Sequence, residues 1–556
     1  MSFSVEHFKQ QFPLFAQPEN RELVYLDNAA TTQKPASVIE AIRNFYLHTN
    51  ANTHRSSHRL ARRATEMVEQ VRRDVAGFLG AASPREVIFT RGATEGLNLL
   101  ANSLCSQLRP GDEIVLSTAE HHANLVPWQM MAASRDLRLR FVPDIAGVPQ
   151  FDRIDEVLSA RTRIVSVTAG SNALGFRTDL DLLRNALSGR DLFWVLDGSQ
   201  LAAHDPIDVQ AMGCDFFVCS AHKFYGPTGI GLVFGREDLL AALPPWQGGG
   251  EMIASVDLLA SEYAGLPHKF EAGTSSLASI AGLGACIDFL GRQDRAAMAR
   301  HERALVQELH QRLHAIPELT LLSTAENNLG IATLIHPRCA AIDLAHWLDG
   351  RDIAVRVGHH CAQPLLQAAG HVATLRASVA AYNTRQDIDR FVAAVEEFVA
   401  QLDADEGTSS PPVAEHGASA DAWTPDDLAD LDLQRLRDTA TWQDRYRILM
   451  GWAKAISRKE EIRTPANLVR GCESSAWLVH RCDRGVHRFA IDSDSRIVKG
   501  LGALLLTQLG DRPADGSARQ RVLAMFDELG LAQQLSESRS NGFRALLERA
   551  LELMGE

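Results

Sequence analysis

Short apolar runs that alternate with amphipathic segments constrain the fold of the longer, N-terminal part of the chain most strongly. "EVIFT" precedes "RGATEGLNLLANSL", "RIVSVTAGSN" precedes "TDLDLLRNAL", and "LFWVLDGSQ" leads into "DFFVCSAHK" and "GIGLVFG". Strands that are apolar throughout are buried on both faces, which is typical of a parallel sheet covered by helices. The sequence therefore predicts an α/β fold with a large, mostly parallel sheet. From about residue 280, helical patterns around "RALVQELHQRLH" and "IDRFVAAVEEFVAQL" predict a smaller α/β domain.

A segment of different composition divides the chain. Residues 403–425, "DADEGTSSPPVAEHGASADAWTP", are acidic and rich in Ala, Ser and Pro, so we expect a flexible linker between residues 1–402 and residues 426–556. Beyond it, "LRDTATWQDRYRILMGWAKAI" predicts one long helix. "SAWLVHRC" and "VHRFAID", separated by "DRG", predict a β-hairpin. The second unit is therefore expected to be a compact α+β domain.

Composition and charge exclude several classes of function. The net charge is −13 and no basic cluster occurs, which argues against nucleic acid binding. No run of about 18 apolar residues occurs, so we expect no membrane-spanning segment. The start, "MSFSVEHFKQQFPLF", lacks the basic and apolar regions of a signal peptide. Eight cysteines without a CxxC pair predict reduced thiols, a cytoplasmic location and no metal site.

Polar residues end two consecutive apolar strands. "LFWVLD" ends in Asp197, and "DFFVCSAHK" ends in Lys223. In open parallel sheets, ligands bind outside the carboxyl ends of the strands, so these two side chains can meet at one ligand. Pyridoxal 5′-phosphate requires a lysine for its Schiff base and a carboxylate opposite its pyridinium nitrogen. The pair predicts this cofactor, although each residue taken alone also fits a helix cap or a solvated charge.

The phosphate and the ring of such a cofactor also need protein partners. In "RGATEGLN", Thr94 stands where a loop enters a helix, and backbone N–H groups at a helix start bind anions. Ser220 and His222 add hydrogen-bond donors. His121 of "AEHHANLVPW" supplies an imidazole that can stack on a ring and transfer protons.

A series of motifs spans residues 24–383. In order they read "YLDNAATT", "RGATEGLNL", "EHHANLVPW", "VLDGSQ", "SAHKFYGPTGIG", "FEAGTSS" and "GHHCAQPLL…LRASVAAYNT". The set resembles the SufS/CsdA-type cysteine desulfurases, a branch of the fold-type I, pyridoxal phosphate-dependent aminotransferase-like enzymes. The resemblance extends over residues 1–402 and implies a large sheet domain followed by a small α/β domain.

The resemblance implies a role for each site residue. Lys223 forms the Schiff base, and Asp197 pairs with the pyridinium nitrogen. Gln200 contacts the phenolic oxygen of the cofactor, and His121 stacks on its ring. The other implied contacts are to the phosphate, from Thr94, Ser220, His222 and, across a homodimer, Thr274 of the neighbouring subunit, and to the substrate carboxylate, from Asn172, Arg376 and Arg356.

"RVGHHCAQPLL" places Cys361 next to two histidines. From the residues alone, Cys361 is a metal ligand, a nucleophile or a buried apolar residue, although adjacent side chains point in different directions and chelate poorly. The resemblance implies the nucleophile, which takes sulfur from L-cysteine as a persulfide and leaves L-alanine. His359 and His360 are candidates to promote ionisation of the thiol, because an unperturbed thiol is mostly protonated at neutral pH.

Three further motifs follow the linker. "LVRGCESSAWLV", "IDSDSRIVKGLGALLL" and "LSESRSNGFRALL" resemble, in this order, the SufE/CsdE family of sulfur-acceptor proteins over residues 426–556. The receiving cysteine of that family corresponds to Cys472. Without the resemblance, a buried thiol at a strand edge would be the simpler interpretation of Cys472. Cys482, inside the predicted hairpin, is expected to be buried in that way.

The sequence thus indicates a cysteine desulfurase that passes sulfur from Cys361 to Cys472 for iron–sulfur cluster assembly, with scaffold proteins as recipients. A selenocysteine lyase would use the same cofactor site and is one alternative. A scaffold that holds iron or zinc through "HHC" and Cys472 is another. A third alternative gives the C-terminal domain a regulatory or docking role without sulfur transfer.

Overall fold

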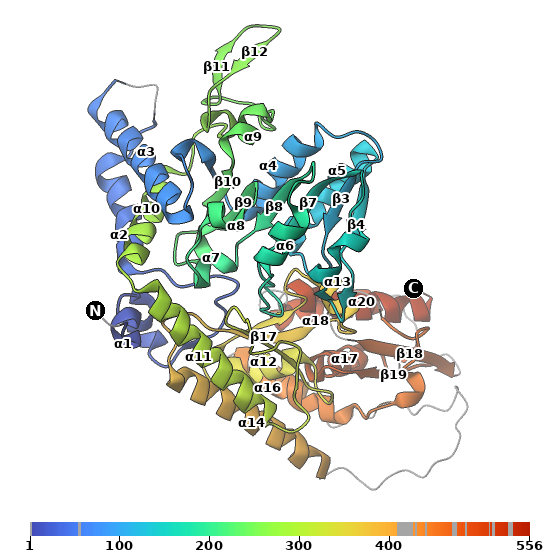
Figure 1. Ribbon diagram of the computed structural model, residues 1–556. Coiled ribbons are helices and arrows are strands. Elements are labelled where there is room, and N and C mark those ends of the chain that lie inside the picture. The colour runs from blue at the N-terminus through green and yellow to red at the C-terminus, as the bar shows by residue number, and fades with distance from the viewer. Residues whose placement is uncertain are drawn as a thin grey trace.

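A seven-stranded sheet organises the N-terminal part of the chain (Figure 1). The computed structural model describes residues 3–53, 57–407, 426, 428, 431–439, 442–469, 475–483, 486–510, 512–513, 517–531 and 537–555. In spatial order the strands are β2 (Val87–Thr90), β10 (Gly231–Gly235), β9 (Phe216–Ser220), β8 (Phe193–Asp197), β7 (Thr162–Thr168), β3 (Glu113–Leu116) and β4 (Arg138–Phe141). Within this sheet β10 runs antiparallel to both of its neighbours, and the other adjacent strands pair in parallel. The predicted mostly parallel sheet is confirmed.

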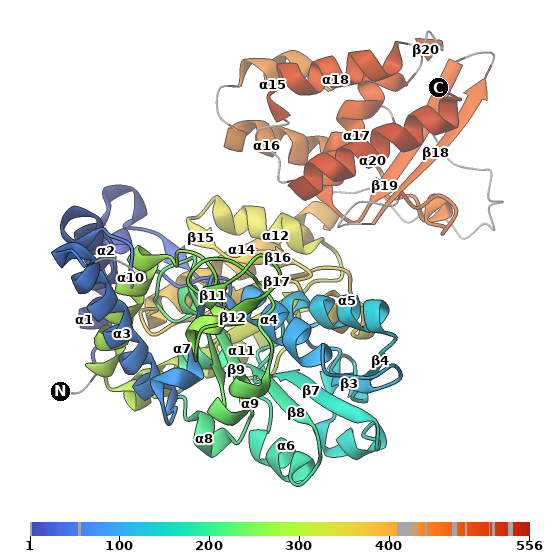
Figure 2. The same ribbon diagram turned by 90° about the horizontal axis from the view of Figure 1, so that it is seen from above.

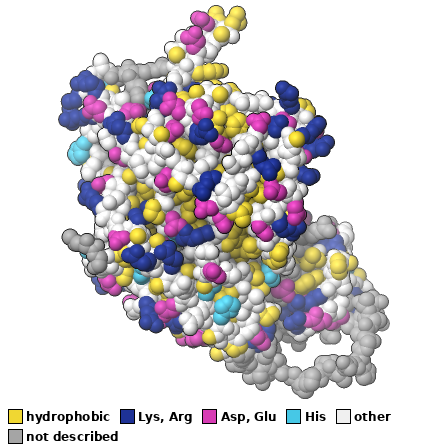
Figure 3. All heavy atoms as spheres, viewed as in Figure 1, with side chains coloured by type: hydrophobic (Ala, Val, Ile, Leu, Met, Phe, Trp, Pro, Cys, Tyr) yellow, Lys and Arg dark blue, Asp and Glu magenta, His cyan; other side chains and the backbone are white. Residues whose placement is uncertain are grey.

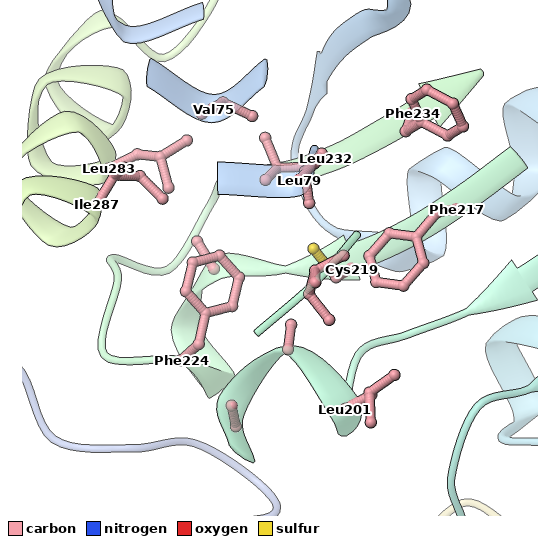
Figure 4. Close-up of a cluster of buried hydrophobic side chains, with 14 of the residues drawn as sticks. Val75, Leu79, Leu201, Phe217, Cys219, Phe224, Leu232, Phe234, Leu283 and Ile287 are labelled. Atoms are coloured by element: carbon pink, nitrogen blue, oxygen red, sulfur yellow. The ribbon is translucent and has the colours of Figure 1, made fainter. Parts of the chain in front are cut away.

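Both faces of the sheet are buried, because the side chains of each strand alternate between two apolar clusters. Phe217 and Cys219 of β9 face one cluster, and Phe216 and Val218 face the other. The first cluster, shown in Figure 4, packs side chains of α3 and α10 against β9 and β10. The covering helices are α2 (Ala36–Asn44), α3 (Arg59–Leu79) and α10 (Leu277–Gly291) on one face and α4 (Ala93–Cys105) and α5 (Val126–Arg135) on the other.

A four-stranded antiparallel sheet forms the small domain. Its order is β13 (Thr320–Leu321), β14 (Ile331–Ile335), β17 (Thr374–Ser378) and β16 (Arg356–Gly358), and it packs with α11 (Arg295–His314), α12 (Ala341–Asp349) and α14 (Arg385–Gly407). The N-terminal β1 (Val24–Tyr25) pairs in parallel with β15 (Ile353–Ala354) and so joins this domain. Because α10 packs on α2 and α3, the small domain begins at α11, later than the pattern predicted. Helix α14 continues to Gly407, into the segment for which the sequence predicts a linker.

The C-terminal unit is a separate body in Figure 2 and contains the predicted hairpin. β18 (Ala476–Asp483) pairs antiparallel with β19 (Val486–Ser493), which also pairs with β20 (Arg512–Pro513). The helices are α15 (Leu433–Asp438), α16 (Trp442–Trp452), α17 (Arg496–Leu509), α18 (Ala518–Glu528) and α20 (Glu537–Met554). Their apolar side chains form a core distinct from those of the first two domains.

Two predictions for this unit are wrong. The single long helix is two helices, because Thr439 adopts an extended backbone (φ −74°, ψ 119°) and its hydroxyl donates to the carbonyl of Arg435, 2.7 Å away. A side-chain bond of this kind competes with helix continuation. Cys482 is exposed rather than buried: it lies near the end of β18, opposite His487.

The remaining elements are short. They are α1 (Val5–Lys9), α6 (Leu180–Leu187), α7 (Leu201–His204), α8 (Val209–Met212), α9 (Glu237–Ala242), α13 (Gln363–Ala368), β5 (Asp144–Ile145), β6 (Val148–Pro149), β11 (Ile253–Val256) and β12 (Ser261–Tyr263). β11 and β12 form a hairpin that projects from the large domain (Figure 1). In the described part of the chain, every helix is too short or too polar to cross a membrane.

Gly500 tests the packing of the C-terminal core. A Cβ at this position of α17 would lie 2.1 Å from the carbonyl oxygen of Leu449 in α16, so the two helices must separate to accept one. We expect Gly500→Ala to lower the unfolding free energy of this domain by about 1–3 kcal/mol. Gly451→Ala is the matched control, since a Cβ on Gly451 of α16 meets nothing within 4 Å. Urea unfolding of both variants measures the two unfolding free energies. Equal values for Gly500→Ala and Gly451→Ala would contradict the close crossing of α16 and α17.

Candidate functional site

Lys223 and Asp197 meet at the carboxyl ends of neighbouring strands. β9 ends at Ser220 and passes directly into a single 3₁₀ turn, η7 (Ala221–Lys223), while β8 ends at Asp197. Burial lowers the pKa of Lys223, the charge of Asp197 opposes this shift, and that of Arg376 adds to it. Among the described residues, none forms a hydrogen bond with Lys223 Nζ. A desolvated amine of this kind is suited to form a covalent bond with a carbonyl carbon.

The start of α4 offers an anion-binding cradle beside this turn. Gly92 precedes the helix without a side-chain cap, and Ser220 Oγ accepts the N–H of the first helical residue at 2.7 Å. A Cβ at Gly231 would lie 2.5 Å from the backbone of Gly92, so β10 and the cradle approach closely because residue 231 is glycine. Thr94 is exposed at the second helical position. His222 lies in η7, and burial, followed by neighbouring lysine charges, lowers its pKa to about 4.

The imidazole of His121 is uncharged in this environment. Burial is the main cause that lowers its pKa to about 3, and the charge of Lys223 is the next. His121 Nδ1 accepts the N–H of Ala123 at 3.0 Å, so the ring hydrogen of the neutral form resides on Nε2. His121 therefore presents an N–H donor and an uncharged ring face at the site.

Two arginines from adjacent strands share one carboxylate. Arg356 and Arg376 are paired residues of β16 and β17, and Asp27 Oδ2 lies 2.8 Å from Arg356 Nη2 while Asp27 Oδ1 lies 3.3 Å from Arg376 Nη2. Arg376 Nη1 donates to the carbonyl of Asn172 at 2.6 Å. Arg376 Nε is buried and has no partner in the described part of the chain, and burial lowers the pKa of Arg376 to about 10. The arrangement leaves donors available for a further carboxylate.

Asp27 was not predicted from the sequence. Asp27 follows the strand that contains Tyr25 and lies in the motif "YLDNAATT". Its position just after a strand is the one sequence feature that could have marked it as a site residue. Its partners are more than 300 positions away, and only the fold reveals them.

Cys361 is exposed on a tightly turned loop. Both His360 and Cys361 adopt the left-handed region (φ 52° and 55°), which is strained for residues with a side chain. The loop is held from both sides: His122 N–H donates to the Cys361 carbonyl at 2.7 Å, and Asn172 Nδ2 donates to the His360 carbonyl at 2.6 Å. The N–H of Cys361 donates to His359 Nδ1 at 3.1 Å.

The loop brings the thiol to the buried site. Asn172 links the two, since its side chain donates to the His360 carbonyl and its own carbonyl accepts from Arg376 Nη1, each at 2.6 Å. Burial lowers the pKa of Lys223 and of Arg376, and a negative charge on Cys361 partly opposes this lowering. His360 does not promote ionisation, because its ring is buried against Thr374 Oγ1 and burial keeps its pKa well below the usual value. His359 faces His122, with ring centroids 5.3 Å apart.

The remaining predicted residues are Gln200, Thr274 and Cys472. Gln200 donates from Nε2 to the carbonyl of Ala29 at 2.9 Å. Thr274 is exposed and lines a separate cavity of about 270 Å³ with Arg91 and Glu95. Cys472 lies outside the described residues.

The residues present fit pyridoxal 5′-phosphate. A partly buried lysine without a hydrogen-bond partner among the described residues, a carboxylate at the neighbouring strand end and a helix start whose N-cap is a glycine are the groups that its aldehyde, ring nitrogen and phosphate require. The unpartnered Arg376 Nε fits an anionic substrate beside it.

Comparison with known proteins identifies relatives for both parts of the chain. The family Aminotransferase class-V matches residues 24–391, and the Fe-S metabolism associated domain, SufE, matches residues 432–554. A protein named "Cysteine desulfurase" from Pectobacterium atrosepticum is 42% identical over 406 residues, which are 71% of this chain and 98% of the relative. "Probable cysteine desulfurase 1" from Mycobacterium leprae is 42% identical over 70% of this chain, and the match spans 64% of that protein's length. The crystal structure of the Escherichia coli cysteine desulfurase CsdA (S-sulfonic acid) is 36% identical, with a TM-score of 0.68 over 72% of this chain and 100% of that one.

Thiol alkylation tests the placement of the cysteines. Burial raises the pKa of Cys105, Cys214 and Cys286 to about 12 and also raises that of Cys219, whereas Cys361 is exposed. We expect iodoacetamide to modify Cys361 in the native protein at least about a hundredfold faster than these four cysteines. The four buried thiols react only after local unfolding exposes them. Exposed Cys482 serves as the internal reference in peptide mass spectrometry. Native modification of Cys286 at the rate of Cys482 would contradict the structure.

Proposed function

The chain belongs to the class-V aminotransferase family as a pyridoxal 5′-phosphate-dependent cysteine desulfurase with a C-terminal SufE domain, and we propose that it passes sulfur from L-cysteine through Cys361 to Cys472 of the same polypeptide. The proposal rests on Cys361, which is exposed on a strained loop. A charge on this thiol affects the pKa of Lys223 and of Arg376. The recipients we propose are scaffold proteins of iron–sulfur cluster assembly. The proposed division is a desulfurase domain at 1–402, a linker at 403–425 and an acceptor domain at 426–556.

The proposed cofactor contacts follow the geometry of the strand ends. Lys223 binds the aldehyde covalently, and Asp197 holds the proton on the ring nitrogen. His121 stacks on the ring and transfers a proton at Nε2, the nitrogen that its contact with Ala123 leaves free. The other proposed contacts are those of Gln200 with the phenolic oxygen and of Thr94, Ser220, His222 and the neighbouring subunit's Thr274 with the phosphate.

The proposed reaction at Cys361 breaks one bond and forms one. Arg376, Arg356 and Asn172 hold the carboxylate of L-cysteine and orient its sulfur toward the loop. The cofactor, when bound, accepts electron density from the substrate α-carbon. The Cys361 thiolate then attacks the substrate sulfur, an S–S bond forms, and the electron pair of the C–S bond stays with the carbon skeleton. That skeleton takes up protons and leaves as L-alanine, while Cys361 carries the persulfide.

The second proposed step moves the outer sulfur. The thiolate of Cys472 attacks the terminal sulfur of the Cys361 persulfide, the original S–S bond breaks, and Cys361 leaves as a thiolate. Because α14 continues to Gly407, residues 408–425 are what remains of the predicted linker, and as a flexible chain they would give an end-to-end reach of roughly 20–25 Å. Tethering at this length corresponds to a millimolar effective concentration of acceptor, which favours transfer within the chain.

Contacts between the desulfurase domain and the C-terminal unit support delivery within one chain. Asp343 of α12 is buried, and its carboxylate accepts the N–H of Arg496 at 2.8 Å and the hydroxyl of Ser495 at 3.3 Å. Because Ser495 and Arg496 begin α17, a carboxylate of the first domain lies at the positive end of a helix of the second. The elements face each other in Figure 2.

Apolar and aromatic contacts extend this docking surface along α12. Ile342 packs against the core of the C-terminal unit, and the rings of His346 and Tyr446 have centroids 4.1 Å apart. A cavity of about 940 Å³ lies between the two parts, lined from one side by Arg338 and His371 and from the other by Arg463 and Lys499. The docked arrangement therefore supports a defined orientation of the acceptor domain rather than a freely tumbling one.

A homodimer is also part of the proposal. The hairpin of β11 and β12 projects from the large domain and exposes Leu258 and Leu259 completely, as the apolar side chains at the top of Figure 3 illustrate. Apolar side chains exposed to this extent are typical of an interface. Exposed Thr274 lies beside a cavity to which a second subunit can add groups.

Removing Cys472 should separate the two proposed steps. In Cys472→Ala, each active site should release one equivalent of alanine in a burst, and further turnover should slow at least about tenfold because the persulfide stays on Cys361. Strong small-molecule reductants should restore the rate. The measurement is alanine release with and without reductant.

The controls are Cys482→Ala and Cys361→Ala. Cys482→Ala removes an exposed thiol of the same domain and should behave as wild type. Cys361→Ala should retain the cofactor but lose the burst, because sulfur then has no acceptor at the site. Equal reductant-free rates for Cys472→Ala and Cys482→Ala would show that Cys472 is not the acceptor.

Asp343 tests whether docking assists transfer. Asp343→Ala leaves the buried N–H of Arg496 without its acceptor, which we expect to weaken docking by about 1–3 kcal/mol. Turnover without reductant should fall, whereas the reductant-supported rate, which needs no acceptor domain, should not change. Asp349→Ala alters an exposed carboxylate on the same helix and is the matched control. Identical reductant-free rates in the two variants would contradict a role for this contact.

A further inference from the structure

Four hydrogen-bond donors converge on one backbone oxygen next to Lys223. The carbonyl of His222 accepts from Thr32 N at 3.0 Å, Thr31 Oγ1 at 3.1 Å, Thr32 Oγ1 at 3.2 Å and Lys34 Nζ at 2.9 Å. A carbonyl oxygen has two lone pairs, so this number of donors is unusually high. We call Thr31, Thr32 and Lys34 the clamp. They come from the loop after β1, about 190 positions before the carbonyl that they hold.

The clamp also holds the far side of the turn. Thr32 Oγ1 accepts the N–H of Tyr225 at 2.8 Å, which leaves the hydroxyl hydrogen of Thr32 to donate to His222. One hydroxyl therefore bridges the backbone on both sides of Lys223. The backbone bonds of the turn itself go to a different carbonyl, since Phe224 and Gly226 donate to Ala221 at 3.1 and 2.9 Å.

The clamp is itself anchored in the small domain. Tyr25 Oη donates to the carbonyl of Thr31 at 2.9 Å, and the N–H of Gln33 donates to Tyr382 Oη at 3.0 Å. Tyr382 is fully buried. These bonds fix the clamp relative to both domains that border the site.

Lys34 has an unusual environment for a cation. Burial lowers its pKa to about 8, and no carboxylate of the described residues forms an ion pair with it. Its ammonium group donates to the carbonyls of His222 and Thr32 and to Thr31 Oγ1. Burying a charge without a counter-charge is costly. An apolar residue of similar length would avoid this cost, which indicates a purpose beyond packing.

We propose that Lys34, Thr31 and Thr32 are positioning residues for the cofactor lysine: by holding the His222–Lys223 peptide, they fix the direction in which Lys223 Nζ points. The inference rests on the proposed role of Lys223. Because Lys223 Nζ has no partner of its own among the described residues, its backbone must supply its orientation. Without the clamp, Nζ would sample other positions relative to Asp197, His121, Arg376, Arg356 and Cys361, the charged and titratable groups that face it.

The test compares Lys34→Met with Lys269→Met in the cofactor-loaded enzyme. Lys269 is another buried lysine with a lowered pKa, and it donates to the carbonyls of Ala241 and Leu243, away from the strand ends. Both variants remove a buried ammonium group, but only the first loosens Lys223. The readouts are the pH titration of the lysine-linked cofactor absorbance, kcat and KM for cysteine, and thermal unfolding.

In Lys34→Met we expect the titration midpoint to move by about half a pH unit or more and kcat to fall about tenfold, with KM changed less than about threefold. Lys269→Met should titrate as wild type even if its melting temperature falls. A Lys34→Met enzyme with wild-type midpoint and kcat would overturn the inference.

A second pair keeps the test decisive if Lys34→Met does not fold. Thr32→Val preserves shape but removes the bridging hydroxyl, and Thr32→Ser retains it. Thr32→Val should show the shifted midpoint, and Thr32→Ser should restore it; equal midpoints in the two would overturn the inference.

Borohydride reduction followed by peptide mapping distinguishes failure of the proposed function from failure of the inference about the clamp. If the cofactor is linked to a residue other than Lys223, the proposed function and this inference both fail. If the link is at Lys223 but the clamp variants titrate as wild type, the inference alone fails.

Discussion

The ion pair that Asp27 makes with both Arg356 and Arg376 is the interaction on which the site depends. The two arginines are paired residues on neighbouring strands, and Arg376 is almost fully buried whereas Arg356 is exposed. Without a shared carboxylate, the positive charge of Arg356 would add to the cost of keeping Arg376 charged. Asp27 also forms a β-bridge with Ser378, which ties the loop after β1 to the edge of the small domain. The same loop continues to Ala29, which accepts from Gln200, and to the clamp on His222. One short N-terminal segment thus contacts the two arginines proposed to bind substrate, the proposed cofactor contact Gln200 and the backbone beside the proposed cofactor lysine.

The parts of the site that the sequence predicted are those where local pattern and chemistry coincide. Asp197 and Lys223 each end an apolar run, and a parallel sheet places such ends at one edge whatever the details of packing. Asp27 and Lys34 could not be predicted in this way, because their roles depend on residues that are distant in sequence. The sheet and the hairpin were predicted because strand periodicity is a strong signal. The broken helix at Thr439 depends on a single backbone torsion, and the exposure of Cys482 depends on the tertiary packing around one end of the hairpin.

The fusion changes the physical problem of sulfur delivery. Two separate proteins must find each other by diffusion, and their contact surface must supply the whole free energy of association. In a single chain the linker removes most of that entropic cost, so a modest surface such as Asp343, Ile342 and His346 of α12 can hold the acceptor domain in place. A weak contact would be an advantage in the proposed relay, in which the C-terminal domain also releases its sulfur to a further protein.

The distribution of thiols has a consequence for the fidelity of sulfur routing. Cys219 lies one residue before Ser220 and is therefore close to the proposed cofactor site, yet it is fully buried and its pKa is raised by burial. A persulfide sulfur moves only to a thiolate that can reach it, so Cys219, Cys286 and the other buried thiols are silent toward the intermediate that forms near them. Selectivity against the four buried thiols, those of Cys105, Cys214, Cys219 and Cys286, then requires no recognition of sulfur itself. It follows from the folding of the core, which keeps these competing nucleophiles away from the persulfide.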